Sequence, residues 1–116
     1  MTTSLECPWL EVEPHGDTLD VKVTCRDILD EEATHALSTT LFRLAEEGGG
    51  RRLVLDLGAV RCMESGMVAK LVKLHRNCKA EGGGLVLSCL QPSLLEVFQT
   101  LQLTRFLNIH RPESGT

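Results

Sequence analysis

Residues 53–75 read LVLDLGAVRCMESGMVAKLVKLH, and this stretch decides the fold. Its opening apolar run, residues 53–57, is typical of a strand buried on both faces of a parallel sheet. From Met67 onward the apolar spacing changes to about 3.6 residues, which predicts an α-helix. The apolar stripe of this helix consists of Met67, Leu71, Leu74 and Cys78. We therefore expect a strand–loop–helix unit.

The loop of this unit presents Glu64, Ser65 and Gly66 at the start of the helix. The first turn of a helix has free N–H groups and a partial positive charge. Ser65 is therefore suited to the N-cap position, and the negative charge of Glu64 is favoured beside the positive end of the helix. Ligands and partners of open α/β sheets gather outside the carboxyl ends of the strands. The sequence leaves two interpretations open, namely that Ser65 serves only as a cap or that this loop is a contact site.

Three blocks of sequence follow one another in the order of a known family. They are residues 53–57 (LVLDL), residues 60–67 (VRCMESGM) and residues 82–87 (GGGLVL). In this order and spacing the chain resembles the STAS domain family, most closely the small bacterial anti-sigma factor antagonists. The resemblance covers roughly residues 9–110.

In those antagonists a serine at the helix start accepts phosphate from a partner kinase. Aligned without gaps, that acceptor position falls on Gly66, and Ser65 matches the serine before it. A one-residue deletion would instead make Ser65 the family acceptor, and Glu64 replaces the family aspartate in either alignment. We prefer the ungapped alignment and expect no phosphate at Gly66. At Ser65, whose hydroxyl should turn inward to cap the helix, we expect weak phosphorylation at most.

The remaining sequence predicts a single α/β domain with a mixed, mostly parallel sheet in the order β-β-α-β-α-β-α-β. Residues 9–13 and 19–23 alternate apolar and charged residues around a turn, which predicts a hairpin. Asp30 should cap a helix that ends at glycines 48–50, glycines 82–84 should end the central helix, and proline at 92 should open a short helix. We expect residues 1–8 to form an irregular arm, 9–110 the STAS-like domain with a last edge strand at 105–109, and 111–116 a polar tail.

Composition excludes several classes of protein. The net charge of −4 and the aromatic content of 3% argue against binding of nucleic acid. No apolar run is long enough for insertion into a membrane and no signal peptide is visible, so we expect a cytoplasmic protein. Five cysteines without a C-x-x-C pair suggest neither disulfides nor a metal site, and Cys62 and Cys78 fit core positions. We find no catalytic constellation and expect no cofactor and no enzymatic activity.

The resemblance implies a protein-binding regulator whose partner is an anti-sigma factor with a serine-protein-kinase fold. It places the partner-binding surface on the following residues: Asp27, Asp30, Glu64, Ser65, Gly66, Met67 and Val68. Met67 should lie half covered at the exposed end of the helix. The alternative is a non-phosphorylated STAS subunit of a lipid-transport ATPase or of a stress-signalling assembly, which the glycine at 66 suits. The basic central helix and the acidic first helix are either solvated faces or a bipolar surface that orients a partner.

Overall fold

The computed structural model describes residues 9–47 and 51–110 of the chain. It opens with the predicted hairpin, in which β1 (Leu10–His15) pairs antiparallel with β2 (Thr18–Val23) around a turn at Gly16. Leu10 pairs with Val23 and Val12 with Val21, and all four side chains are buried. The alternation of apolar and polar residues thus puts one face of the hairpin on the core.

Four of the five strands in the main sheet are parallel. The order across the sheet is β1-β2-β4-β6-β7, with β4 (Arg52–Asp56), β6 (Gly84–Ser88) and β7 (Asn108–His110). Strand β2 pairs with β4, β4 with β6 and β6 with β7, all in parallel register. The sheet is therefore mixed and mostly parallel, as predicted.

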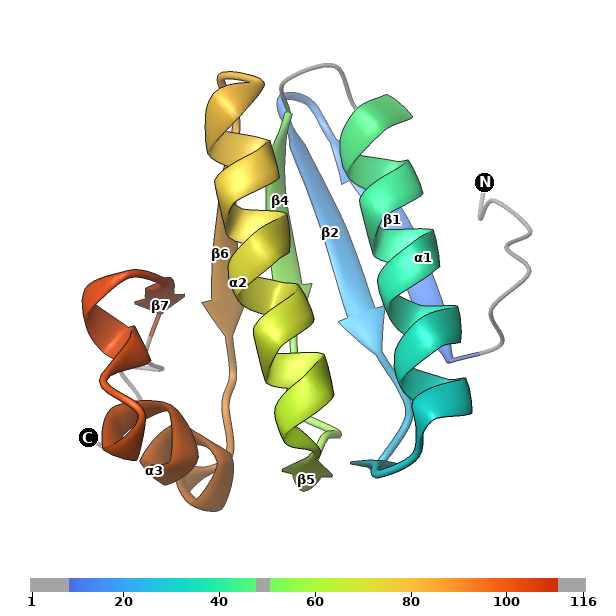
Figure 1. Ribbon diagram of the computed structural model, residues 1–116. Helices are drawn as coiled ribbons and strands as arrows, with labels where there is room; N and C mark the ends of the chain where they lie inside the picture. Colours follow the sequence, from blue (N-terminus) through green and yellow to red (C-terminus); the bar gives the residue numbers. More distant parts are fainter. Residues whose placement is uncertain (1–8, 48–50, 111–116) are drawn as a thin grey trace.

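Helices α1 (Glu31–Glu47) and α2 (Ser65–Ala80) lie side by side over one face of this sheet (Figure 1). The chain continues through α3 (Pro92–Thr100) and the 3₁₀ turn η1 (Leu103–Arg105), which lie near the β7 edge. Leu55 on β4 and Leu71 on α2 are fully buried, so the predicted strand–loop–helix unit forms the centre of the core. Gly82 ends α2 with a φ of 89°, as its position predicted.

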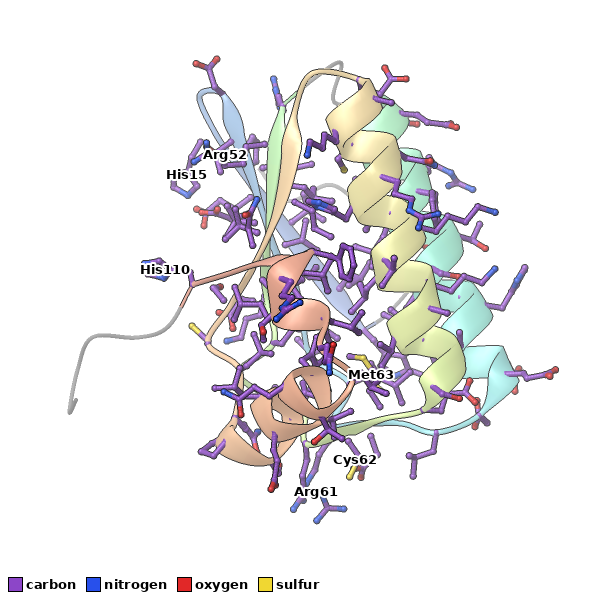
Figure 2. The ribbon with its side chains drawn as sticks, turned by 60° about the vertical axis from the view of Figure 1, so that its left-hand side comes forward. His15, Arg52, Arg61, Cys62, Met63 and His110 are labelled. Carbon is purple, nitrogen blue, oxygen red and sulfur yellow. The ribbon has the colours of Figure 1, made fainter. Side chains whose placement is uncertain are left out.

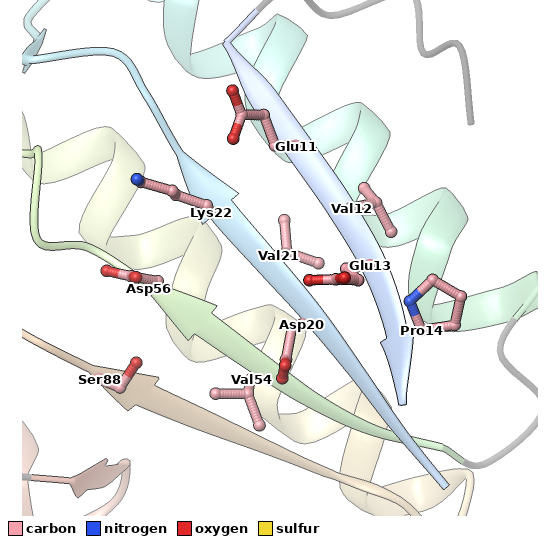
Figure 3. Close-up of a pocket in the computed structure, with 10 residues that line it drawn as sticks. All are labelled: Glu11, Val12, Glu13, Pro14, Asp20, Val21, Lys22, Val54, Asp56 and Ser88. Atoms are coloured by element: carbon pink, nitrogen blue, oxygen red, sulfur yellow. The ribbon is translucent and has the colours of Figure 1, made fainter. Parts of the chain in front are cut away.

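None of the helices in the described part of the chain covers the other face of the sheet, and the prediction of a strand buried on both faces is wrong. Val54 and Asp56 point away from the helices and remain partly exposed. This open face carries mainly polar side chains, including Glu11, Asp20, Lys22, Asp56 and Ser88 (Figure 3). His15, Arg52 and His110 lie on the same side (Figure 2). Helices α1 and α2 both pack on the same face of the sheet. A short apolar run such as that of β4 does not show whether helices cover one face of the strand or both.

A second, two-stranded parallel sheet was not predicted. It pairs β3 (Asp27–Ile28) with β5 (Cys62–Met63), which follow β2 and β4 in the chain. Cys62 is exposed on this pair, so its predicted place in the core is wrong, whereas Cys78 is buried as predicted.

The C-terminal segment also differs in detail from the prediction. Arg105 lies in η1, so the last strand begins at Asn108 and not at Arg105 as predicted. The predictions for residues 1–8, 48–50 and 111–116 fall outside the described residues. Among the helices that the structure describes, none is long and apolar enough to cross a membrane.

Candidate functional site

The short β3–β5 ladder brings together the two loops on which the candidate residues lie. The backbone N–H of Arg61 donates to the carbonyl of Arg26 over 2.7 Å, and that of Glu64 donates to the carbonyl of Ile28 over 2.7 Å. Parallel strands end at the same edge of a sheet, so the loops after β2 and β4 meet beyond it. The start of α2 is therefore held beside the start of α1.

An ion pair also joins these two loops. The guanidinium of Arg61 donates from Nε to Oδ1 of Asp27 and from Nη2 to Oδ2, each over 3.2 Å. This side-chain hydrogen bond and the charge of Asp27 raise the pKa of Arg61 above its ordinary value. Two parallel N–H···O bonds fix the relative orientation of the groups as well as their separation. Asp27, a candidate partner contact, thus ties the two loops together.

Asp30 caps helix α1, as the sequence predicted. Its Oδ1 accepts a hydrogen bond of 2.7 Å from the N–H of Ala33, and its carbonyl accepts one of 3.1 Å from the N–H of Thr34. A side-chain acceptor at this position satisfies a donor that the helix itself leaves unpaired. Asp30 is exposed as well, so it can meet a partner while it caps the helix.

Glu64, not Ser65, occupies the N-cap position of α2, so the prediction of a serine cap is wrong. Its backbone is extended, and its carbonyl accepts the N–H groups of Met67 and Val68. Its carboxylate accepts a short hydrogen bond from the hydroxyl of Thr34, a buried residue of α1. Ser65 begins the helix proper, its side chain is exposed, and no side-chain cap bond forms. The exposed side chain of Ser65 therefore does not serve as the cap.

Gly66 is exposed in the first turn of α2, next to the Glu64 carboxylate. A Cβ added at Gly66 would lie 3.4 Å from Oε2 of Glu64 and 3.5 Å from its Cδ. These are close to ordinary contact distances, so a serine fits here with little movement. A fixed carboxylate thus stands where the field of the helix favours negative charge, directly beside Gly66.

The side chains of Met67 and Val68 are buried, with exposed fractions of 1% and 4%. The prediction that Met67 is half covered is therefore wrong. Strand β5 pairs with β3 immediately before the helix, and the apolar stripe of α2 is buried from its first residue, Met67. We expect Met67→Asp to unfold the protein, so this change cannot test partner binding.

Leu29 is a candidate contact that the sequence analysis missed. It lies between Ile28 and Asp30 with 61% of its surface exposed, although it is a large apolar residue. The sequence signal that could have identified Leu29 is that it is an apolar residue outside any periodic apolar pattern. We call the exposed residues of the two loops the loop-pair surface: Leu29, Asp30, Arg61, Cys62, Ser65 and Gly66.

The chemistry of the loop-pair surface suits binding. Across the described ranges, no group of three or more His, Cys, Asp or Glu side chains could hold a metal ion. Three of the candidates, Asp30, Ser65 and Gly66, are exposed, while Asp27 and Glu64 are engaged in bonds that join the loops. The arrangement presents one apolar side chain and a helix N-terminus on a fixed frame.

Comparison with known proteins identifies the fold and the family. The model of the STAS domain family matches residues 10–114. A putative anti-sigma factor antagonist from Thermotoga maritima is 18% identical, with a TM-score of 0.75 over 90% of this chain and 87% of its own. A STAS domain protein from Planctomyces limnophilus, described as an anti-sigma-factor antagonist, is 16% identical, with a TM-score of 0.76 over 90% and 91%. The phosphorylated form of the Bacillus cell fate determinant SpoIIAA is 16% identical, with a TM-score of 0.68 over 90% and 92%. The chain therefore belongs to the STAS domain family.

Proposed function

We propose that this chain is a cytoplasmic, non-enzymatic regulator that binds an anti-sigma factor of the serine-kinase fold through the loop-pair surface. The family and the structural likeness to anti-sigma factor antagonists support this proposal. The observation that carries it is the exposed Leu29 held next to the start of α2 by the β3–β5 ladder. A rigid apolar side chain within a polar rim is the usual anchor of a protein interface.

The magnitude of this anchor can be estimated from its exposure. Full burial of a leucine side chain contributes about 1.5–3 kcal/mol. Since 61% of Leu29 is exposed, a partner that covered it completely would gain about 1–2 kcal/mol from this side chain. The Asp27–Arg61 pair and the Thr34–Glu64 bond hold the frame in place, so little ordering entropy opposes the gain.

The test is to recover the kinase-fold partner from the native cytoplasm and to measure its affinity for purified variants by calorimetry. We expect Leu29→Asp to weaken binding about tenfold or more. The matched control is Leu101→Asp, because Leu101 is also half exposed but lies at the end of α3, outside the loop-pair surface. Equal affinities of wild type and Leu29→Asp, with the fold intact, would contradict the proposal.

We further propose that binding is not switched by phosphate at Gly66, which has no hydroxyl. Ser65 has an exposed hydroxyl, and a phosphate there would meet the free N–H groups at the helix start. It would also add about −1.5 to −2 charges beside Glu64 and alter the surface that the partner contacts. Incubation with the cognate kinase and ATP, followed by mass spectrometry, distinguishes the two alignments. Stoichiometric phosphoserine at Ser65 would show that the chain is a regulated antagonist and that the ungapped alignment is wrong.

The alternative function is a constitutive STAS subunit of a lipid-transport ATPase or of a stress-signalling assembly. The specific observation in its favour is Gly66, together with a carboxylate fixed beside it by Thr34. Such a subunit needs no hydroxyl at this position. The identity of the protein recovered with the chain separates the two functions. A transporter ATPase whose binding depends on Leu29 would replace the anti-sigma factor as partner and leave the loop-pair surface as the contact.

A further inference from the structure

A groove of about 600 Å³ lies between the C-terminal half of α2 and the η1 segment. Helix α2 contributes Val72, Arg76 and Lys79 to its lining, and the η1 segment contributes Leu103, Arg105 and Phe106. The loop-pair surface lies at the opposite end of α2, and the two sites share no residue. The groove is therefore a separate feature of the molecule.

Phe106 is the apolar centre of this groove and has 64% of its surface exposed. Its position is fixed, because its N–H donates to the carbonyl of Leu103 over 3.0 Å and the N–H of Leu107 donates to the same carbonyl over 2.9 Å. Leu107 is buried and anchors the turn in the core. An exposed aromatic ring on a hydrogen-bonded turn offers apolar area to a partner, and the backbone that carries the ring is already ordered.

Positive charge stands on both walls of the groove. Arg76 and Lys79 lie on α2, and Arg105 lies on the opposite wall. None of the three forms a salt bridge within residues 9–47 and 51–110. Arg76 and Lys79 also suit the negative end of the α2 dipole, but Arg105 is outside that helix, so the dipole does not explain its place.

His75 also lines the groove but adds little positive charge at neutral pH. Burial, and secondarily the neighbouring charge of Lys79, lowers its pKa below the ordinary 6.5. The positive charge of the groove therefore comes from the side chains of Arg76, Lys79 and Arg105. It persists although the whole chain has a net charge of −4.

We propose that this groove binds an acidic peptide segment of a partner protein, in which one large apolar side chain is flanked on both sides by carboxylates. The apolar side chain packs against Phe106 and Leu103, and the carboxylates pair with the cations of the two walls. A fatty acid or similar amphiphile has a single head group and would leave the cations of one wall unpaired. Cations on both sides of an apolar centre thus favour a peptide.

The experiment selects peptides from a displayed random library on the full chain. Two variants remove the groove's recognition groups: Arg105→Glu reverses one charge and Phe106→Ser removes the ring. The matched controls are Lys70→Glu, which makes the same charge change at an exposed position of α2 outside the groove, and Leu101→Ser, which removes another exposed apolar side chain. Circular dichroism and thermal melting confirm that each variant folds.

We expect the selected sequences to carry glutamate or aspartate on both sides of a Phe, Leu or Met. A labelled peptide of that sequence should bind about tenfold or more weakly to each groove variant and with nearly unchanged affinity to the controls. Its affinity should fall as ionic strength rises. Selection of no peptide that depends on Arg105 and Phe106, or of neutral and basic sequences only, would overturn the proposal.

Two further measurements test the other occupants. Oleate binding that Phe106→Ser abolishes, without any selected acidic peptide, would overturn the proposal in favour of an amphiphile. Dimerisation that Arg105→Glu abolishes, measured by analytical ultracentrifugation and again without a selected peptide, would overturn it in favour of a second copy of this chain. Neither outcome bears on the loop-pair surface, because Leu29 lies outside the groove.

Discussion

Thr34→Val tests whether the carboxylate of Glu64 is held by helix α1. The substitution replaces a hydroxyl with a methyl of similar volume, at a side chain that is 6% exposed, so packing changes little. Its main effect is to remove the hydrogen bond from Thr34 to the Glu64 carboxylate. A hydrogen bond to a charged group contributes about 1.5–3 kcal/mol, and Glu64 remains partly exposed to water. We therefore expect a loss of about 1–2 kcal/mol in the free energy of unfolding.

The assay is equilibrium unfolding in urea followed by circular dichroism. With a slope of about 2 kcal/mol per molar urea, the expected loss lowers the midpoint by about 0.5–1 M. Thr40→Val is the matched control, because Thr40 is buried on the same helix and its hydroxyl donates only to the carbonyl of Ala36, over 2.9 Å. That carbonyl also accepts the helical N–H of Thr40, so this second substitution should cost far less.

A double-mutant cycle completes the test. If the bond is responsible, Thr34→Val should cost almost nothing once Glu64→Ala is present, and the coupling energy should be about 1–2 kcal/mol. Additive effects of the two substitutions, or equal losses in Thr34→Val and Thr40→Val, would show that the bond does not stabilise the site. In that case the proposed positioning of Glu64 beside Gly66 would have no energetic basis.

Three further predictions concern the core and its titrating groups. Leu71→Ala should cost about 2–5 kcal/mol in unfolding free energy, because Leu71 is fully buried at the centre of the core; a loss well below 1 kcal/mol in the same urea assay would contradict the assigned helix face. Burial, with a smaller effect of Glu81, raises the pKa of the Cys78 thiol, so iodoacetamide should label the exposed Cys62 much faster than Cys78 in the native protein, as peptide mass spectrometry would show. Folding lowers the pKa of His75 from its ordinary value of 6.5, so near and below pH 6.5 the unfolded chain binds more protons than the folded chain, and stability should fall as the pH drops through 6.5. The His75→Gln variant should therefore lose less stability than the wild type between pH 7 and pH 5. Parallel curves of stability against pH for the two proteins would contradict this assignment.

Much of the fold could be predicted because its signals are local. The hairpin follows from period-two alternation ending at a turn, and the buried stripe of α2 follows from its 3.6-residue spacing. The positions of residues outside these periodic patterns were predicted less accurately. Cys62 has an apolar neighbourhood in the sequence but lies exposed on a two-residue strand, because that strand pairs with another loop and not with the main sheet.

The candidate site could be predicted in position but not in detail. Its location followed from the order of the sequence blocks, and the structure brings the loop of Asp27 and Asp30 beside the start of α2. The identity of the N-cap could not be read from composition, since serine is the better capping residue in isolation. The bond from Thr34, 30 positions earlier in the chain, fixes Glu64 instead, and no local pattern encodes such a contact.

The order of strands in the main sheet also limits how another protein can attach to it. Among residues 9–47 and 51–110, the outermost strands are β1 and β7, and three residues of β7 are described. Strand β1 carries Glu11, Glu13 and His15, and Pro14 has no backbone N–H to donate. Charge, proline and short length each discourage an extended segment from joining a sheet at its edge. Recognition by strand addition is thus disfavoured at both edges, and the same devices protect the chain against aggregation between sheets.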